Sequence, residues 1–181
     1  MSHTSTQAGL TGSWVWDDII LVPSALTNAA IFPDLVTVPG TGVLLPGFDG
    51  VSKTESLTGS FEIPHGYQCG TDLRPHVHFM VAAGSGDVEW KLEYSRASVD
   101  GTLTTNQTVT ALRTVTIGQH MVVEFDVIDG TDVDIGDVFL FRLYRVGNAA
   151  NDTHNDDAIL LSLGFHYKSD TVGSRGIFSK T

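Results

Sequence analysis

Residues 88–95 read VEWKLEYS, in which every even position is apolar and every odd position is polar. Successive side chains of a β-strand point to opposite faces, so this alternation predicts a strand with one buried face and one face in water. The alternation recurs in residues 108–117 and again in residues 121–127. No stretch of the sequence carries the sustained 3.6-residue period of a helix. The middle of the chain therefore predicts consecutive strands.

Two later segments are more apolar, and turn-forming stretches separate all of these segments. Residues 138–145 begin with apolar residues at almost every position, which predicts a central strand covered on both faces. Residues 158–167 predict a strand with Ile159, Leu161, Leu163, Phe165 and Tyr167 on one side. About eight strands at this spacing predict an all-β fold, an antiparallel two-sheet sandwich that is jelly-roll-like. The pattern alone does not separate a sandwich from a barrel.

The N-terminal part of the chain has a different character, because all six prolines lie within the first 75 residues. Residues 14–50 are apolar but are interrupted by proline and glycine, which would break a helix repeatedly. They predict an extended N-terminal arm with short strands, preceded by a flexible tail at residues 1–13. We therefore divide the single folding domain into residues 1–50, the tail and arm, and residues 51–181, the β-sandwich. On this division, deleting residues 1–50 should leave a folded sandwich.

The arm supplies our candidate interface residues. Trp14 and Trp16 share a face if they lie on a strand, and we expect them to anchor the arm on the sandwich or on a neighbouring subunit. An exposed tryptophan pair that stacks on carbohydrate is the alternative. The full set of interface candidates is Trp14, Trp16, Ile31, Phe32, Leu44, Leu45 and Phe48.

Composition argues against several kinds of partner. The 181 residues carry a formal net charge of −11, so we expect no general basic face for nucleic acid. No apolar run approaches the length of about 18 residues that crosses a membrane. The N-terminus lacks the basic and apolar regions of a secretory signal, so none is expected. One cysteine, Cys69, excludes an intrachain disulfide and a cysteine-based zinc cage.

The sharpest local motif is His76-Val77-His78. On a strand the two imidazoles point to the same face, so both could meet one metal ion. The favoured interpretation is structural, with two half-buried histidines at a sheet edge. One alternative is a metal shared by three such pairs on a threefold axis. The other is a cupin-like metal site, but its glutamate is missing, since residues 81–83 are Val-Ala-Ala. His65, His120 and His166 are the candidate third ligands.

The polar stretch GNAANDTHNDD at residues 147–157 is a second candidate cation site. Asp152, Asn155, Asp156 and Asp157 offer oxygen ligands of the kind calcium uses, although the spacing is not that of an EF-hand. A solvated polar turn is the favoured interpretation. The sequence contains no G-x-S-x-G nucleophile motif and no phosphate-binding glycine loop. We therefore expect no catalytic residues, no cofactor and no enzymatic activity.

Nearly the whole chain resembles a family of small structural proteins of tailed bacteriophages. The matching stretches occur in the right order, although family members often carry Trp where this chain has Phe79, and residues 19–50 match weakly. The stretches are WDD at 16–18, IPHGY at 63–67, LRPHVHF at 73–79, GDVEWKLEY at 86–94, RLYR at 142–145, DDAILL at 156–161, HYKSD at 166–170 and GS at 173–174.

The resemblance implies a virion protein that is made in the host cytoplasm. The first expectation is a cement or decoration protein on the capsid exterior, which binds the major capsid protein and clamps capsomers as a homotrimer. The alternative is a trimeric tail or receptor-binding knob that contacts tail proteins or a host surface receptor. A metal-dependent cupin-like enzyme centred on His76 and His78 is the third expectation.

Overall fold

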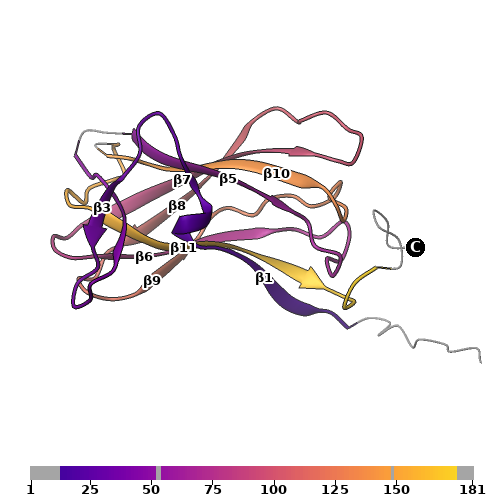
Figure 1. The fold of residues 1–181 in the computed structure, drawn as a ribbon, viewed down its shortest axis with the longest axis horizontal. Coiled ribbons are helices and arrows are strands. Elements are labelled where there is room, and N and C mark those ends of the chain that lie inside the picture. The colour runs from indigo at the N-terminus through magenta and orange to yellow at the C-terminus, as the bar shows by residue number, and fades with distance from the viewer. Residues whose placement is uncertain (1–12, 52–53, 148, 175–181) are drawn as a thin grey trace, which may run out of the picture.

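A computed structural model describes residues 13–51, 54–147 and 149–174, and two antiparallel β-sheets pack face to face in it (Figure 1). The expected all-β sandwich is thus confirmed. The first sheet contains β1 (Val15–Leu21), β3 (Asp34–Thr37), β4 (Leu44–Phe48), β6 (Arg74–Val81), β9 (Met121–Glu124) and β11 (Ala158–Ser169). The second contains β2 (Thr27–Asn28), β5 (Thr54–Glu62), β7 (Asp87–Ala97), β8 (Gln107–Thr114) and β10 (Val138–Val146), and a short 3-10 helix, η1 (Pro23–Ala25), precedes β2.

The strand order is that of a jelly roll. The first sheet, called here the β11 sheet, has the order β3-β4-β11-β6-β9, and β1 also pairs with β11. The second, called the β10 sheet, has the order β2-β5-β10-β7-β8. Apart from β7 and β8, strands that follow one another from β4 to β11 lie in opposite sheets, as in the double Greek key of a jelly roll.

Large aromatic side chains fill the space between the sheets. Val88, Trp90, Leu92 and Tyr94, the apolar residues of the alternating stretch, all belong to this core. The Trp90 ring meets Phe48 edge-on, with 4.9 Å between ring centroids. Such edge-to-face pairs add about 0.5–1.5 kcal/mol to the stabilisation from burial alone. The strict alternation of residues 88–95 was therefore a correct guide to the buried face of β7.

Two strands differ from the expectation. In β11 the register shifts between Leu160 and Ser162, so the core receives Ala158 and Leu160 before this β-bulge and Leu163, Phe165 and Tyr167 after it. The prediction that Ile159 and Leu161 share a face with Leu163 was wrong, because an extra residue reverses the alternation. The strand β10 is central in its sheet, but Val138 and Leu140 are exposed, so it is not covered on both faces.

The N-terminal segment is built into the sandwich. Strand β1 pairs with β11 from Val15 opposite Ser169 to Leu21 opposite Leu163, while β4 pairs with the beginning of β11. Phe48 at the end of β4 is 0% exposed and lies in the core. The expected short strands are present, and they belong to the same sheet and core as the strands of residues 51–181. Residues 1–12 of the expected tail lie outside the described part of the chain.

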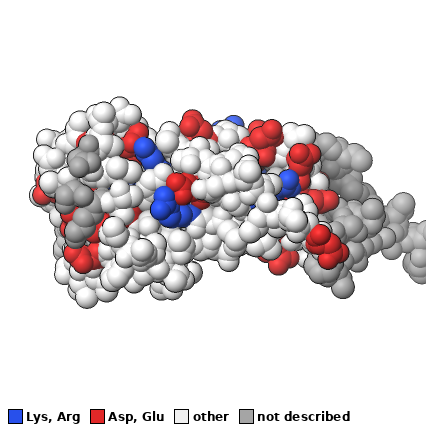
Figure 2. Space-filling view, turned by 90° about the horizontal axis from the view of Figure 1, so that it is seen from above, with Lys and Arg blue, Asp and Glu red and all other residues white. Residues whose placement is uncertain are grey.

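The surface is sparsely charged where Figure 2 shows it. Acidic side chains are spread over this face, basic ones are few, and most of the face is neutral. Within the described residues, no helix is both long and apolar enough to cross a membrane.

Candidate functional site

The outer face of the β11 sheet carries a cluster of histidines. On β6, Val77 and Phe79 point into the core, so His76 and His78 point to the opposite face, as the motif predicts. Their ring centroids are 5.1 Å apart. This is the outside of the sandwich and not its interior, where the cupin-like alternative would place a metal. The two imidazoles nevertheless turn to different partners.

His76 reaches across β11 toward β1. Its Nε2 lies 3.5 Å from Asp18 Oδ2, and its ring stacks on His166 with 4.1 Å between centroids. The Nε2 atom of His166 lies 3.8 Å from the same Asp18 oxygen. The strand register explains the meeting, because Asp18 is opposite His166 on β11, and His76 is opposite Gly164 two residues earlier. Asp18, His76 and His166 therefore converge from three adjacent strands.

Gly164 provides the space for this convergence. A Cβ atom at this position would lie 2.4 Å from His76 Nε2 and 2.5 Å from its Cε1. Because no side chain is present there, the His76 ring lies over the backbone of β11, where its side chain is only 1% exposed. Any larger residue at position 164 would push the ring away from Asp18.

His78 turns in the other direction, toward the edge strand β9. Its Nδ1 lies 2.7 Å from His120 Nε2, so one ring donates a hydrogen bond to the other. Of the three candidate third ligands, the fold thus brings His166 to His76 and His120 to His78. His65 contacts Ser174 instead. Sequence reasoning missed Asp18, since no local spacing connects residue 18 to residues 76 and 166.

Burial makes the two imidazoles of β6 poor bases. It lowers the pKa of His76 below its ordinary value, and the neighbouring His166 ring acts in the same direction. Burial likewise lowers the pKa of His78, and both His76 and His120 add to the shift. Both rings are therefore neutral at pH 7, and each has one nitrogen whose lone pair can accept a hydrogen bond or bind a metal ion.

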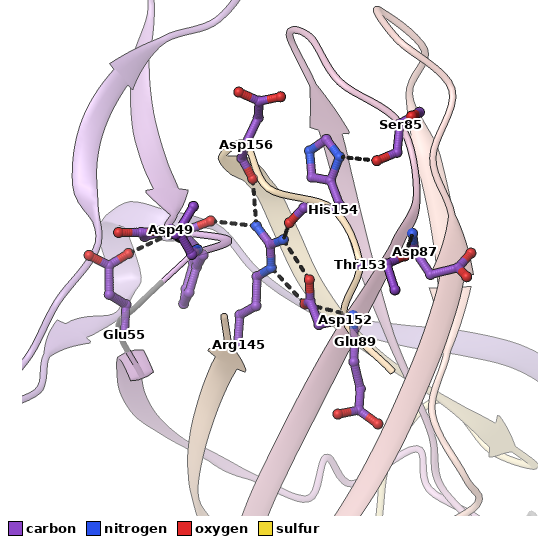
Figure 3. A network of polar contacts seen from close by, with 12 residues as sticks. Asp49, Glu55, Ser85, Asp87, Glu89, Arg145, Asp152, Thr153, His154 and Asp156 are labelled. Atoms are coloured by element: carbon purple, nitrogen blue, oxygen red, sulfur yellow. Dashed lines mark hydrogen bonds and ion pairs between the residues drawn. The ribbon is translucent and has the colours of Figure 1, made fainter. Parts of the chain in front are cut away.

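The polar stretch at residues 147–157 is held by a buried arginine (Figure 3). The Arg145 Nε and Nη2 atoms donate to the two carboxylate oxygens of Asp152 at 2.8 and 2.7 Å. Its remaining N–H groups donate to the backbone carbonyl oxygens of Phe48, Asp156 and His154. Asp152 also accepts the backbone N–H of Glu89. Within residues 149–157 of this stretch Asp152 and His154 are buried, whereas residues 150, 151, 153 and 155–157 are exposed, as the interpretation as a solvated polar turn expects. Asp152 departs from that interpretation, because its carboxylate pairs with the buried Arg145 guanidinium.

The N-terminal segment presents an apolar surface. Trp14 and Trp16 contact each other edge-on, and are 42% and 47% exposed. Lys168 lies over the Trp14 ring and Arg74 over the Trp16 ring, at 4.5 and 5.8 Å from the ring centroids. The other interface candidates divide into the exposed Ile31, Phe32 and Leu44, the half-buried Leu45, and Phe48. Phe48 is corrected, because its side chain is fully buried in the core of its own chain.

Comparisons with known proteins find similarity among solved structures only. No family model matches the chain, and neither does any curated protein. A family 22 carbohydrate-binding and xylanase module pair from Clostridium thermocellum, solved with xylohexaose, is 14% identical, with 90% of this chain and 30% of that chain covered and a TM-score of 0.47. The C-terminal family 22 module of the same xylanase is 13% identical, with 91% of both chains covered and a TM-score of 0.40.

A viral protein is among the other similar structures. A chain of infectious bursal disease virus, Gx strain, is 12% identical, with 78% of this chain and 38% of that chain covered and a TM-score of 0.35. At this level of similarity, none of these structures assigns a function to the protein.

Proposed function

We propose that the protein is a non-enzymatic structural protein of a tailed-bacteriophage virion, a cement protein that clamps capsomers on the capsid exterior as a homotrimer. The resemblance of its sequence to phage structural proteins supports the virion assignment. The structural observation that supports docking on the capsid is the distribution of exposed apolar side chains along the chain. Among the described residues, eleven of the twenty exposed large hydrophobic side chains lie between Trp14 and Val51.

A segment that holds so many exposed apolar side chains is suited to a protein that docks on another. Single exposed apolar residues are ordinary, whereas a concentration of them marks an interaction surface. Strand β1 adds an open edge, because among the described strands it pairs only with β11. A protein that binds only the assembled shell stabilises that shell by its own binding free energy. An apolar surface fixed to a rigid sandwich is suited to this task.

The experiment that tests the proposal is the copy number of this chain in purified particles of the phage that encodes it. Quantitative mass spectrometry would compare its peptides with those of the major capsid protein. A cement protein is expected in the same order of abundance as the capsid protein. The absence of the chain from washed particles would overturn the virion assignment altogether.

A second candidate function is a tail or receptor-binding knob, which the exposed Trp14–Trp16 pair favours. Aromatic rings at a surface offer flat apolar faces for stacking, and an adjoining Lys168 and Arg74 add positive charge. The same copy-number measurement separates the two functions. Tail proteins are present in far fewer copies per particle than proteins that cover the shell.

A further inference from the structure

We propose that Asp18, His76 and His166 form a binding site for one divalent transition-metal ion, with Zn²⁺ as the best match. The ligand atoms of the three side chains all lie within 4.8 Å of one another. Two imidazole nitrogens and one carboxylate oxygen are a common ligand set for zinc. This inference is independent of the virion proposal, since it concerns what a single chain binds.

The distances suit a zinc ion after small movements. Ligand atoms that surround a tetrahedral zinc ion at its usual bond lengths are about 3.3 Å apart. Asp18 Oδ2 lies 3.5 Å from His76 Nε2 and 3.8 Å from His166 Nε2. Closures of a few tenths of an ångström would bring both of these distances to the required value. The His76 and His166 rings, which are stacked at an interplanar angle of 18°, would also have to rotate so that both lone pairs point to one ion. His166 is partly exposed, with 38% of its side chain accessible, so an ion can enter from solvent and a water molecule can complete the shell.

The groups around Asp18 and His76 leave their ligand atoms available to a metal ion. The Asp18 Oδ1 atom is buried beside Gly164 and has no hydrogen-bond partner, while Oδ2 of the same carboxylate faces the two histidines. The His76 Nδ1 atom lies 3.5 Å from the carbonyl oxygen of Arg74. A proton on Nδ1 that points to this carbonyl leaves the Nε2 lone pair directed at Asp18, the arrangement usual for metal-bound histidines.

The site also has a structural consequence. Asp18 lies on β1, His166 on β11 and His76 on β6, so one ion would join three neighbouring strands. The strand β1 carries exposed apolar side chains and has one unpaired edge among the described strands. A metal bound there would fasten the edge strand to the centre of the sheet, independently of its backbone hydrogen bonds.

The test is calorimetric titration of Zn²⁺ into the full chain, after treatment with a chelator and its removal. We expect one ion per chain. Asp18→Asn and His166→Ala should each weaken binding by ~100-fold or more, beyond the 10–100-fold that follows loss of a mere supporting partner. His120→Ala is the matched control, because His120 lies in the same cluster but contacts His78, and it should leave the affinity for Zn²⁺ nearly unchanged.

Three results would overturn the proposal: no binding by the wild-type chain, binding that His166→Ala leaves unchanged, or a loss in His120→Ala as large as in His166→Ala. Weak binding of several ions, equal in all variants, would show adventitious surface binding only and would also count against it. Circular dichroism and urea unfolding of each metal-free variant would establish that it folds. If Asp18→Asn fails to fold, the Zn²⁺ affinity of His166→Ala, a substitution at a partly exposed position, decides whether the proposal stands. Replacing Zn²⁺ by Co²⁺ adds a visible absorption band that reports on the coordination.

Discussion

Arg145 is wholly buried and donates all five of its N–H groups, so its contribution depends on the partners that surround it. Asp152 is the only negative partner in this set. Removing it by Asp152→Ala leaves an uncompensated buried guanidinium, and we expect a loss of about 3–5 kcal/mol in the free energy of unfolding. Urea denaturation monitored by tryptophan fluorescence measures this.

The matched control for this prediction is an exposed ion pair. Arg74 and Glu124 lie 4.0 Å apart with side chains 45% and 59% exposed. Glu124→Ala should therefore change the unfolding free energy by only about 0–1 kcal/mol. Equal effects of Asp152→Ala and Glu124→Ala would mean that Arg145 is solvated in solution and does not hold the 147–157 stretch.

Gly164 is the second residue at which we predict that a single substitution destabilises the fold. In Gly164→Ala the added Cβ would lie 2.4 Å from His76 Nε2, and the buried ring has to move. Such overpacking costs about 1–3 kcal/mol, which a thermal or urea unfolding curve would show. Gly42→Ala is the control, since a Cβ there meets nothing within 4 Å and the backbone is not left-handed. If both variants were equally stable, His76 would not lie over β11.

At this same scale, the sequence was a partial guide to the candidate site. The i, i+2 spacing correctly placed His76 and His78 on one face, because the rule depends only on the strand's two-residue period. The partner of each ring depends on the sheet order and register. Asp18 meets His166 only because β1 pairs with β11, a contact between residues 148 positions apart in the chain. Periodicity holds no information about such pairings.

At the scale of elements, the bulge in β11 separates two neighbouring leucines. Leu160 is fully buried between the sheets, whereas Leu161 is only partly buried on the other side. Leu160→Ala should cost about 2–5 kcal/mol because it opens a cavity. Leu161→Ala should cost about 1 kcal/mol or less. The comparison of their urea midpoints tests the register, and the opposite ranking would restore the uninterrupted alternation that the sequence predicted.

Alternation succeeded in β7 and failed in β11 for one physical reason. A regular strand keeps its faces, so the pattern of residues 88–95 matches its burial at every position except Glu89, which is buried on the polar face. In residues 158–163 nearly every side chain is apolar. Such a run does not show which alternate residues face the core, because either set could be buried. The apolar start of β10 led to the wrong prediction that both faces of this strand are covered. Leu140 is 42% exposed although its strand is central in the sheet. An apolar residue in a strand need not be covered.

At the scale of the whole molecule, residues 14–50 serve both the fold and the proposed interface, and two variants separate these roles. Deletion of residues 1–50 removes Phe48 from the core and takes both β1 and β4 from β11. Loss of a buried phenylalanine side chain alone costs about 3–5 kcal/mol, a large part of the stability of a domain. We expect the deleted chain to lose its cooperative unfolding transition and to aggregate.

The double variant Ile31→Ser/Phe32→Ser is expected to behave differently, because both side chains are about half exposed and leave the core intact. It should unfold at nearly the wild-type urea concentration, yet bind shells that lack the protein at least about tenfold more weakly, the effect of losing 1.4 kcal/mol of apolar contact. Leu112→Ser on β8, where the leucine is equally exposed, is the control and should bind normally. Cosedimentation with shells measures the binding. If the double variant and the control bound alike, the apolar surface of the N-terminal segment would not be what docks, and the clamp would have to lie elsewhere on the sandwich.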